Sequence, residues 1–160
     1  MENTKHLYNY SMLDIYVDAD ACPVKEEVLR VAMRHKLRVF LVSNSWINMA
    51  VGANVQKILV EAGADIADNW IAERIGEGDI AITADILLAD RCLKKKASVL
   101  GTTGRAFNDD NIGVAKAMRD LSAHLRETGE SSGYNAVFSK QDRSRFLQTL
   151  EEIVQLIKRR

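Results

Sequence analysis

Aspartates stand at the ends of several short apolar runs in this 160-residue chain. Asp18 and Asp20 follow "LDIYV", Asp85 follows "IAIT", and Asp65 and Asp68 lie in "GADIADNW" after a third run. Carboxylates that converge repel one another unless a hard divalent cation, Mg²⁺ or Mn²⁺, binds between them through oxygen ligands. Such a cation can activate water and stabilise the charge of a phosphodiester transition state. The aspartates therefore indicate a metal-dependent nuclease or another phosphodiesterase.

Polar and basic side chains follow the remaining apolar runs. Asn44 follows "LRVFLV", and Arg105 lies in the glycine-bearing segment "GTTGRAFNDDNIG" after "ASVL". The guanidinium of Arg105 is suited to contact a phosphate of the substrate, and Lys25 could hold a neighbouring phosphate. We therefore expect Lys25, Asn44 and Arg105 to contribute to substrate binding.

Some of these aspartates also have a purely structural interpretation. Asp20 and Asp65 precede helix-like segments, where aspartate often caps a helix or forms a turn. If Pro23 starts a helix, the chain must turn near Ala21, and Asp20 would cap that helix while Asp18 faces the site. Both interpretations of Asp20 and Asp65 stay open at this stage.

Segments typical of strands and helices alternate along the first two thirds of the chain, which predicts βαβ units and a mainly parallel sheet. The segment 55–63 fits a helix or a strand, and the loop-like residues before it favour a strand. We expect a three-layer α/β domain with a five-stranded, mainly parallel sheet and two C-terminal helices. Its strand ends would bring the aspartates to one edge. The expected strands are 13–17, 37–42, 55–63, 79–83 and 97–101, and the expected helices are 23–35, 65–76, 84–96, 111–129 and 139–160.

Composition narrows the class of protein. Lys and Arg total 22 and Asp and Glu total 22, so any nucleic-acid binding must come from local clusters of charge. No apolar run approaches the ~20 residues of a membrane helix, and the N-terminal residues lack the apolar core of a signal peptide. The two cysteines form neither a disulfide framework nor a zinc motif. We expect a cytoplasmic protein without membrane contact, with 1–12 as an N-terminal extension and 13–160 as a single domain.

Five other residues have a structural interpretation. Asp79 lies at the start of its run and is expected in a turn, and Asp90 is expected to be solvated in the middle of a helix. Cys22 is interpreted as a small buried hydrophobe, because no histidine is placed to activate it. Ser139 with Asp142 resembles a capping box at the start of the last helix.

Several longer motifs resemble one family. The segments "IYVDADACPVK", "DIADNWI", "GDIAITADILLADRCL", "GRAFNDDNIG", "AMRDL" and "DRSRFL" occur in the order typical of the YaiI/YqxD family of bacterial proteins. That family resembles the wider PIN-like nuclease superfamily. Two positions depart from the family pattern: Leu87 stands where proline is usual, and the segment 131–136 replaces a glycine- and proline-rich loop.

The PIN-like resemblance implies a parallel sheet of order 3-2-1-4-5 and an acidic metal site. By motif, Asp18 and Asp85 match the aspartates that end the first and fourth strands. Asp68, or else Asp65, matches the acidic position of the central helix. Asp20 is particular to the smaller family and would ligate the metal or support a ligand.

Our leading hypothesis is a Mg²⁺- or Mn²⁺-dependent nuclease that acts on RNA or DNA, with Asp18, Asp68 and Asp85 as catalytic residues. The sequence contains no G-x-S-x-G, H-E-x-x-H, P-loop or dinucleotide motif to support another mechanism. The alternatives are a module that binds nucleic acid or protein without turnover, and a hydrolase of small phosphate compounds. RNA or single-stranded DNA is the expected partner, and the sequence leaves a homo-oligomer open.

Overall fold

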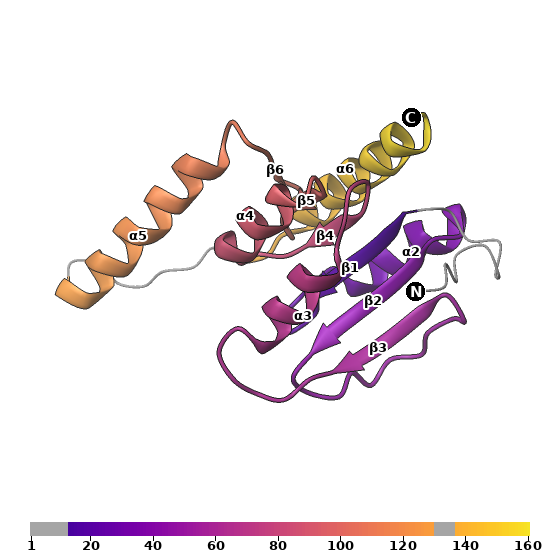
Figure 1. Cartoon of the computed structure of the whole chain (residues 1–160), viewed down its shortest axis with the longest axis horizontal. Helices are drawn as coiled ribbons and strands as arrows, with labels where there is room; N and C mark the ends of the chain where they lie inside the picture. The colour runs from indigo at the N-terminus through magenta and orange to yellow at the C-terminus, as the bar shows by residue number, and fades with distance from the viewer. Residues whose placement is uncertain (1–12, 130–136) are drawn as a thin grey trace.

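Figure 1 shows the chain as a computed structural model, which describes residues 13–129 and 137–160. The N-terminal extension expected at 1–12 and the atypical segment 131–136 lie outside the described residues. The strands are β1 (Asp14–Asp18), β2 (Arg38–Ser43), β3 (Val55–Leu59), β4 (Ile80–Ile82), β5 (Ser98–Leu100) and β6 (Ala106–Phe107). The helices are α2 (Lys25–His35), α3 (Ile66–Arg74), α4 (Ile86–Lys94), α5 (Ile112–Thr128) and α6 (Lys140–Lys158).

The strands form one mixed sheet of order β3-β2-β1-β4-β5-β6. Strands β1 to β5 are parallel and lie in the expected order. The segment that begins at Val55 is a strand rather than a helix. The expectation of only five strands was wrong, because β6 pairs antiparallel with β5. A strand of two residues is too short to show a period of two in the sequence.

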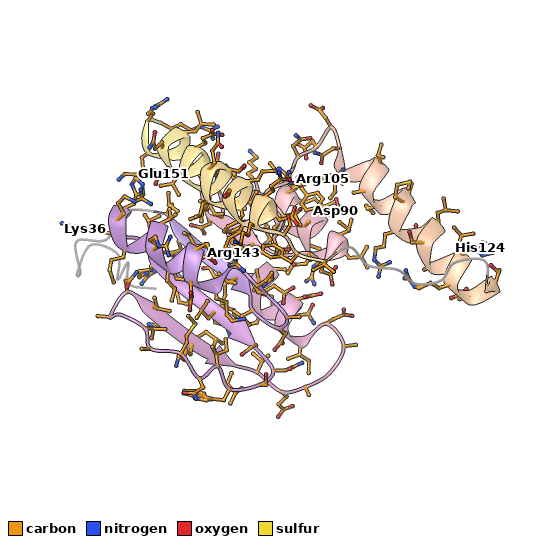
Figure 2. The ribbon with its side chains drawn as sticks, turned by 180° about the vertical axis from the view of Figure 1, so that it is seen from behind. Lys36, Asp90, Arg105, His124, Arg143 and Glu151 are labelled. Carbon is orange, nitrogen blue, oxygen red and sulfur yellow. The ribbon has the colours of Figure 1, made fainter. Side chains whose placement is uncertain are left out.

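Helices α2 and α6 cover one face of the sheet. Phe146, Leu150 and Val154 recur every fourth residue on α6 and are fully buried against the apolar side chains of α2 and the central strands. A buried carboxylate, Glu27 of α2, accepts a hydrogen bond of 2.6 Å from the guanidinium of Arg143 on α6. Figure 2 shows Arg143 and Glu151 on α6 beside α2. The carboxylate of Glu151 makes a second contact between the two helices, 2.6 Å from Nε2 of His35 on α2.

Helices α3 and α4 cover the opposite face, where Ile71 and Leu88 are buried. Helix α5 packs only its beginning against this layer and then extends away from the body of the molecule (Figure 1). The ammonium groups of Lys94 and Lys116 each lie 3.2 Å from the carboxylate of Asp90, which joins α4 to α5. The expectation that Asp90 is solvated was therefore wrong. In the described part of the chain, no helix is long and apolar enough to cross a membrane.

The parallel strands determine where the polar residues gather. Because β1, β2, β3, β4 and β5 all run the same way, their carboxyl ends lie at one edge of the sheet. Helices α3 and α4 begin at this edge, so the ends of β1 and β4 lie near two helix N-termini. The fold therefore contains the sheet edge at which the sequence predicted the functional residues.

Candidate functional site

Three of the predicted aspartates come together at this edge. Asp18 ends β1, Asp85 immediately precedes α4, and Asp68 lies in the first turn of α3. β1 and β4 are paired neighbours, which places the ends that carry Asp18 and Asp85 side by side. The charges of Asp85 and Asp18 both act on Asp68 and disfavour its ionised form. The three carboxylates therefore form one electrostatic cluster, which we call the acidic cluster.

Thr83 fixes two members of the acidic cluster. Its buried hydroxyl donates a hydrogen bond of 2.8 Å to Oδ2 of Asp18 and accepts one of 3.0 Å from the backbone N–H of Asp85. Thr83 is a member of the site that was not predicted from the sequence. The signal that could have found it is the spacing T-x-D, which places a hydroxyl two residues before the second aspartate.

Asp85 also caps a helix. Its Oδ1 accepts hydrogen bonds from the backbone N–H groups of Leu87 and Leu88, at 2.9 and 3.2 Å. Such a cap holds the carboxylate in a fixed orientation at the positive end of the helix dipole. Asp85 uses Oδ1 for the cap and Asp18 uses Oδ2 for Thr83, so each carboxylate keeps a second oxygen for another contact.

Burial and the neighbouring charges raise the pKa values of Asp68 and Asp18. Burial is the largest cause for Asp68, followed by the charges of Asp85 and Asp18, and together they raise the pKa of Asp68 to about 6. Burial also raises the pKa of Asp18, the hydrogen bond from Thr83 opposes this, and the charges of Asp85 and Asp20 add to the rise. Ionised carboxylates are thus held close together at an energetic cost, which a bound cation would remove.

Asp20 joins two loops instead of capping α2. Its Oδ2 accepts a hydrogen bond of 2.9 Å from the backbone N–H of Asn44, which follows β2. The residue at the N-cap position of α2 is Val24, so the structural interpretation in which Asp20 caps this helix was wrong. The turn near Ala21 is confirmed, because Ala21 has a φ of 56°. A left-handed alanine is strained, and this turn separates Asp18 from the start of α2.

Asp65 lies at the N-cap position of α3 with a φ of 66°, but its side chain makes no capping hydrogen bond. It is exposed, and its charge adds to the rise in the pKa of Asp68. The structure thus places Asp65 at the margin of the acidic cluster. Asp68 lies closer to the interior of this site.

Two predicted phosphate-binding residues have different surroundings. The ammonium of Lys25 donates to the backbone carbonyls of Ala19 and Cys22, at 3.2 and 2.7 Å, and so holds the strained turn together. Arg105 is exposed and lies over the ring of Phe107, with 5.4 Å between its guanidinium carbon and the ring centroid. The substrate-binding roles of Lys25 and Arg105 stay predictions.

Arg105 belongs to a loop that packs on the first turns of α6. A Cβ on Gly104, whose φ is 91°, would lie 2.7 Å from Cγ of Arg145, so only glycine fits there. Arg145 also donates a hydrogen bond of 3.3 Å to the carbonyl of Thr103. Helix α6 thereby brings Arg145 beside the loop of Arg105, which the sequence analysis did not foresee. Arg145 belongs to the motif "DRSRFL", which is the sequence feature that could have identified it.

The acidic cluster has the donor chemistry of a site for Mg²⁺ or Mn²⁺, since carboxylate oxygens are the ligands these cations prefer. Within residues 13–129 and 137–160, no group of three or more His, Cys, Asp or Glu side chains is arranged to hold a metal ion as it stands. The carboxylates therefore fit a hard cation by their type and proximity. Their side chains would have to adjust to coordinate it.

The interpretations of Cys22 and Asp79 agree with the structure. Cys22 is buried among apolar residues, and burial raises the pKa of its thiol. Asp79 accepts hydrogen bonds from the backbone N–H groups of Asp14 and Gly76, at 2.9 and 3.0 Å, and so organises the turn before β4. Ser139 and Asp142 form the expected capping box of α6. These residues belong to the framework of the site.

Comparison with known proteins gives a consistent family. The sequence profile described as "Uncharacterized BCR, YaiI/YqxD family" matches residues 16–156. The UPF0178 protein of Agrobacterium fabrum is 59% identical over 145 residues, which cover 91% of this chain and 95% of that protein. The UPF0178 protein of Rhizobium meliloti is 57% identical and covers 91% of this chain and 99% of its own length. That of Parvibaculum lavamentivorans is also 57% identical, over 93% of this chain and 98% of that protein.

The search of solved structures found no match. The family assignment therefore depends on sequence, and it covers both the strands that carry the acidic cluster and the helices that pack around them. The chain belongs to the YaiI/YqxD family.

Proposed function

We propose that this protein is a divalent-metal-dependent nuclease of PIN-like type that hydrolyses phosphodiester bonds of RNA or DNA. The observation that carries the proposal is the acidic cluster, in which burial, and then the charges of Asp85 and Asp18, raise the pKa of Asp68 to about 6. The parallel strand order β3-β2-β1-β4-β5 supports the PIN-like part of the proposal. Mg²⁺ or Mn²⁺ is the proposed cofactor.

Asp18, Asp68 and Asp85 would hold the cation, and Asp20 would support the edge of the site through its bond to the loop of Asn44. The cation would supply Lewis-acid activation of water and of the scissile phosphate. Thr83 keeps Asp18 and the backbone of Asp85 in a fixed relation, so these two ligands need little reorganisation.

Positive charge near this edge would neutralise the phosphates next to the scissile bond. Arg105 is exposed in the loop after β5, and Arg145 contacts the same loop from α6. Because guanidinium groups form paired hydrogen bonds with phosphate oxygens, both residues are suited to position the substrate. Their removal would weaken substrate binding more than it would change the fold.

The test is cleavage of labelled single-stranded RNA by purified protein in Mn²⁺, followed on a denaturing gel. Wild-type protein should cut the RNA, EDTA should stop the reaction, and Asp18→Asn should abolish it. Asp109→Asn is the matched control, because Asp109 is an exposed aspartate in the turn between β6 and α5. Equal cleavage by wild type and Asp18→Asn, or by neither protein, would refute the proposal.

A module that binds nucleic acid without turnover is the second candidate. It is favoured by the exposed side chains of Arg105 and Arg145, which can contact phosphates whether or not a metal ion is bound. RNA binding that persists in EDTA, combined with no cleavage in Mn²⁺ or Mg²⁺, would establish this function in place of the first.

A further inference from the structure

A polar groove lies beside the start of α2. It has a volume of about 660 Å³ and lies between three segments: the start of α2 with the preceding turn, the loop 47–49, and Arg143 of α6. This volume is within the range of about 300–1,000 Å³ typical of ligand sites. Cys22, in its lining, follows Asp20 by two residues, and Asp20 binds the backbone at the start of the opposite loop. The turn that follows Asp18 and Asp20 along the chain therefore leads into the wall of the groove.

Trp46 immediately precedes residues 47–49, which form one wall of this groove. Its side chain is 65% exposed, although the next residue, Ile47, and nearby Met49 pack against the core. The loop is therefore anchored, and the indole is displayed from a fixed support. The ammonium of Lys57 on β3 lies 4.9 Å from the centroid of the indole ring, which favours one orientation of the ring and brings a positive charge beside it.

The cations of the groove are few and mostly engaged. Lys25 binds two backbone carbonyls, and Arg143 binds the buried carboxylate of Glu27. Arg30 lines the groove, is exposed, and makes no ion pair with any residue that the structure describes. Glu26 lines it as well and offsets one positive charge. Electrostatic attraction from this surface alone would be weak, so affinity must come largely from the exposed aromatic ring.

A displayed indole ring beside one or two free cations is the arrangement that binds unpaired bases. Bases of a single strand stack on aromatic side chains and gain about 1–3 kcal/mol each, while the phosphates contact cations nearby. A base inside a duplex has both faces covered by its neighbours and cannot stack on a protein side chain in the same way.

We propose that Trp46 stacks on an unpaired base of a single-stranded nucleic acid that lies in this groove, with Arg30 and Lys57 at the adjoining phosphates. The proposal deepens the nuclease function and rests on it for the role of the bound strand, since it names single-stranded polynucleotide as the substrate class. Two phosphate contacts predict a salt slope of only about −1.4 in log K against log salt concentration. Stacking predicts little dependence on base sequence.

The test follows the fluorescence of Trp46 directly. The chain has two tryptophans, so Trp70→Phe leaves Trp46 as the only one. Phenylalanine keeps an aromatic ring against Tyr16 and Phe40, which Trp70 contacts at centroid distances of 6.2 and 5.8 Å. In this background with EDTA present, an eight-nucleotide oligouridylate should quench the emission, and an RNA duplex of the same length should not.

Affinity is then measured by fluorescence anisotropy of labelled oligouridylate. Trp46→Ala should weaken binding by about 10-fold or more, whereas Met118→Ala should leave it unchanged. Met118 is the matched control, because it is 56% exposed and lies on α5, away from the groove. Circular dichroism at the same protein concentration confirms that each variant is folded.

The readouts separate this inference from the proposed nuclease activity. Quenching and anisotropy are measured without divalent metal, so they report on the groove even if no RNA is cut in Mn²⁺. Unchanged affinity in folded Trp46→Ala, or equal quenching by single strand and duplex, would overturn the inference. If RNA is cleaved while Trp46→Ala binds normally, the nuclease proposal stands and the stacking role falls.

Discussion

Replacement of Asp68 by asparagine tests the acidic cluster without any assay of activity. Asp68 is the carboxylate whose pKa rises most clearly, from 3.8 to about 6, because burial and then the charges of Asp85 and Asp18 disfavour its ionised form. A change of that size corresponds to about 3 kcal/mol of free energy. Asp68 is partly exposed, and solvent screening reduces this figure to about 1–2 kcal/mol.

Asparagine keeps the shape of the side chain and removes its charge. The change also loses a favourable negative charge in the first turn of α3, worth about 0.5 kcal/mol. The net expectation is that Asp68→Asn stabilises the folded protein by about 1 kcal/mol at pH 8, which raises the Tm by about 3 °C for a chain of this size.

The direction of the pH dependence follows from the raised pKa. Below pH 3.8 the carboxyl is protonated in both the folded and the unfolded chain, so it costs nothing. Between pH 3.8 and about 6 the unfolded chain ionises first, and the folded protein loses stability as the pH rises. Above pH 6 the carboxyl is ionised in both the folded and the unfolded chain, and the whole loss of stability is present. The stabilisation by Asp68→Asn should therefore be largest at pH 8 and almost absent at pH 4.

Urea unfolding followed by circular dichroism, at pH 8 and pH 4, measures this difference. Asp109→Asn is again the control, because it removes one exposed charge outside the acidic cluster. A destabilising effect of Asp68→Asn at pH 8, or the same effect at both pH values, would refute the electrostatic argument. Addition of Mn²⁺ at pH 8 should stabilise wild type more than Asp68→Asn.

Two further substitutions test the supports of the site. Thr83→Val keeps the side-chain volume but removes the hydroxyl that bonds Asp18. It should lower the free energy of unfolding in urea by about 1–2 kcal/mol and reduce the stabilisation by Mn²⁺. An unchanged response to Mn²⁺ would contradict the role of Thr83. Arg143→Ala leaves the buried carboxylate of Glu27 unpaired and should cost about 3 kcal/mol. Adding Glu27→Gln should recover a large part of that loss, and a double variant no more stable than Arg143→Ala would show that the unpaired charge of Glu27 is not its cause.

Local patterns predicted much of the fold because three of the four connections between the parallel strands β1 to β5 contain a helix. β3 was ambiguous, since "VQKILVEAG" satisfies either period, and only its pairing with β2 decides for a strand. The two-residue β6 could not be recognised, because its pairing with β5 depends on the turn that Gly104 permits against α6. That contact joins residues more than 40 positions apart, so no local pattern contains it.

The candidate site was predicted in its aspartates but not in its supports. Strand ends brought Asp18 and Asp85 to one edge, as parallel topology requires. The hydroxyl of Thr83 and the ammonium of Lys25 bind partners inside the loops, and such contacts depend on the side-chain directions of the folded chain. Sequence spacing can place a residue near a site, but it cannot determine which atom the side chain reaches.

The most direct test of the acidic cluster is a crystal structure of the protein soaked in Mn²⁺, with anomalous data collected to locate the ion. The account predicts one or more Mn²⁺ ions between Asp18, Asp68 and Asp85, with carboxylate oxygens at about 2.2 Å. Absence of anomalous density there at millimolar Mn²⁺, with the three carboxylates turned apart into separate salt bridges, would contradict it.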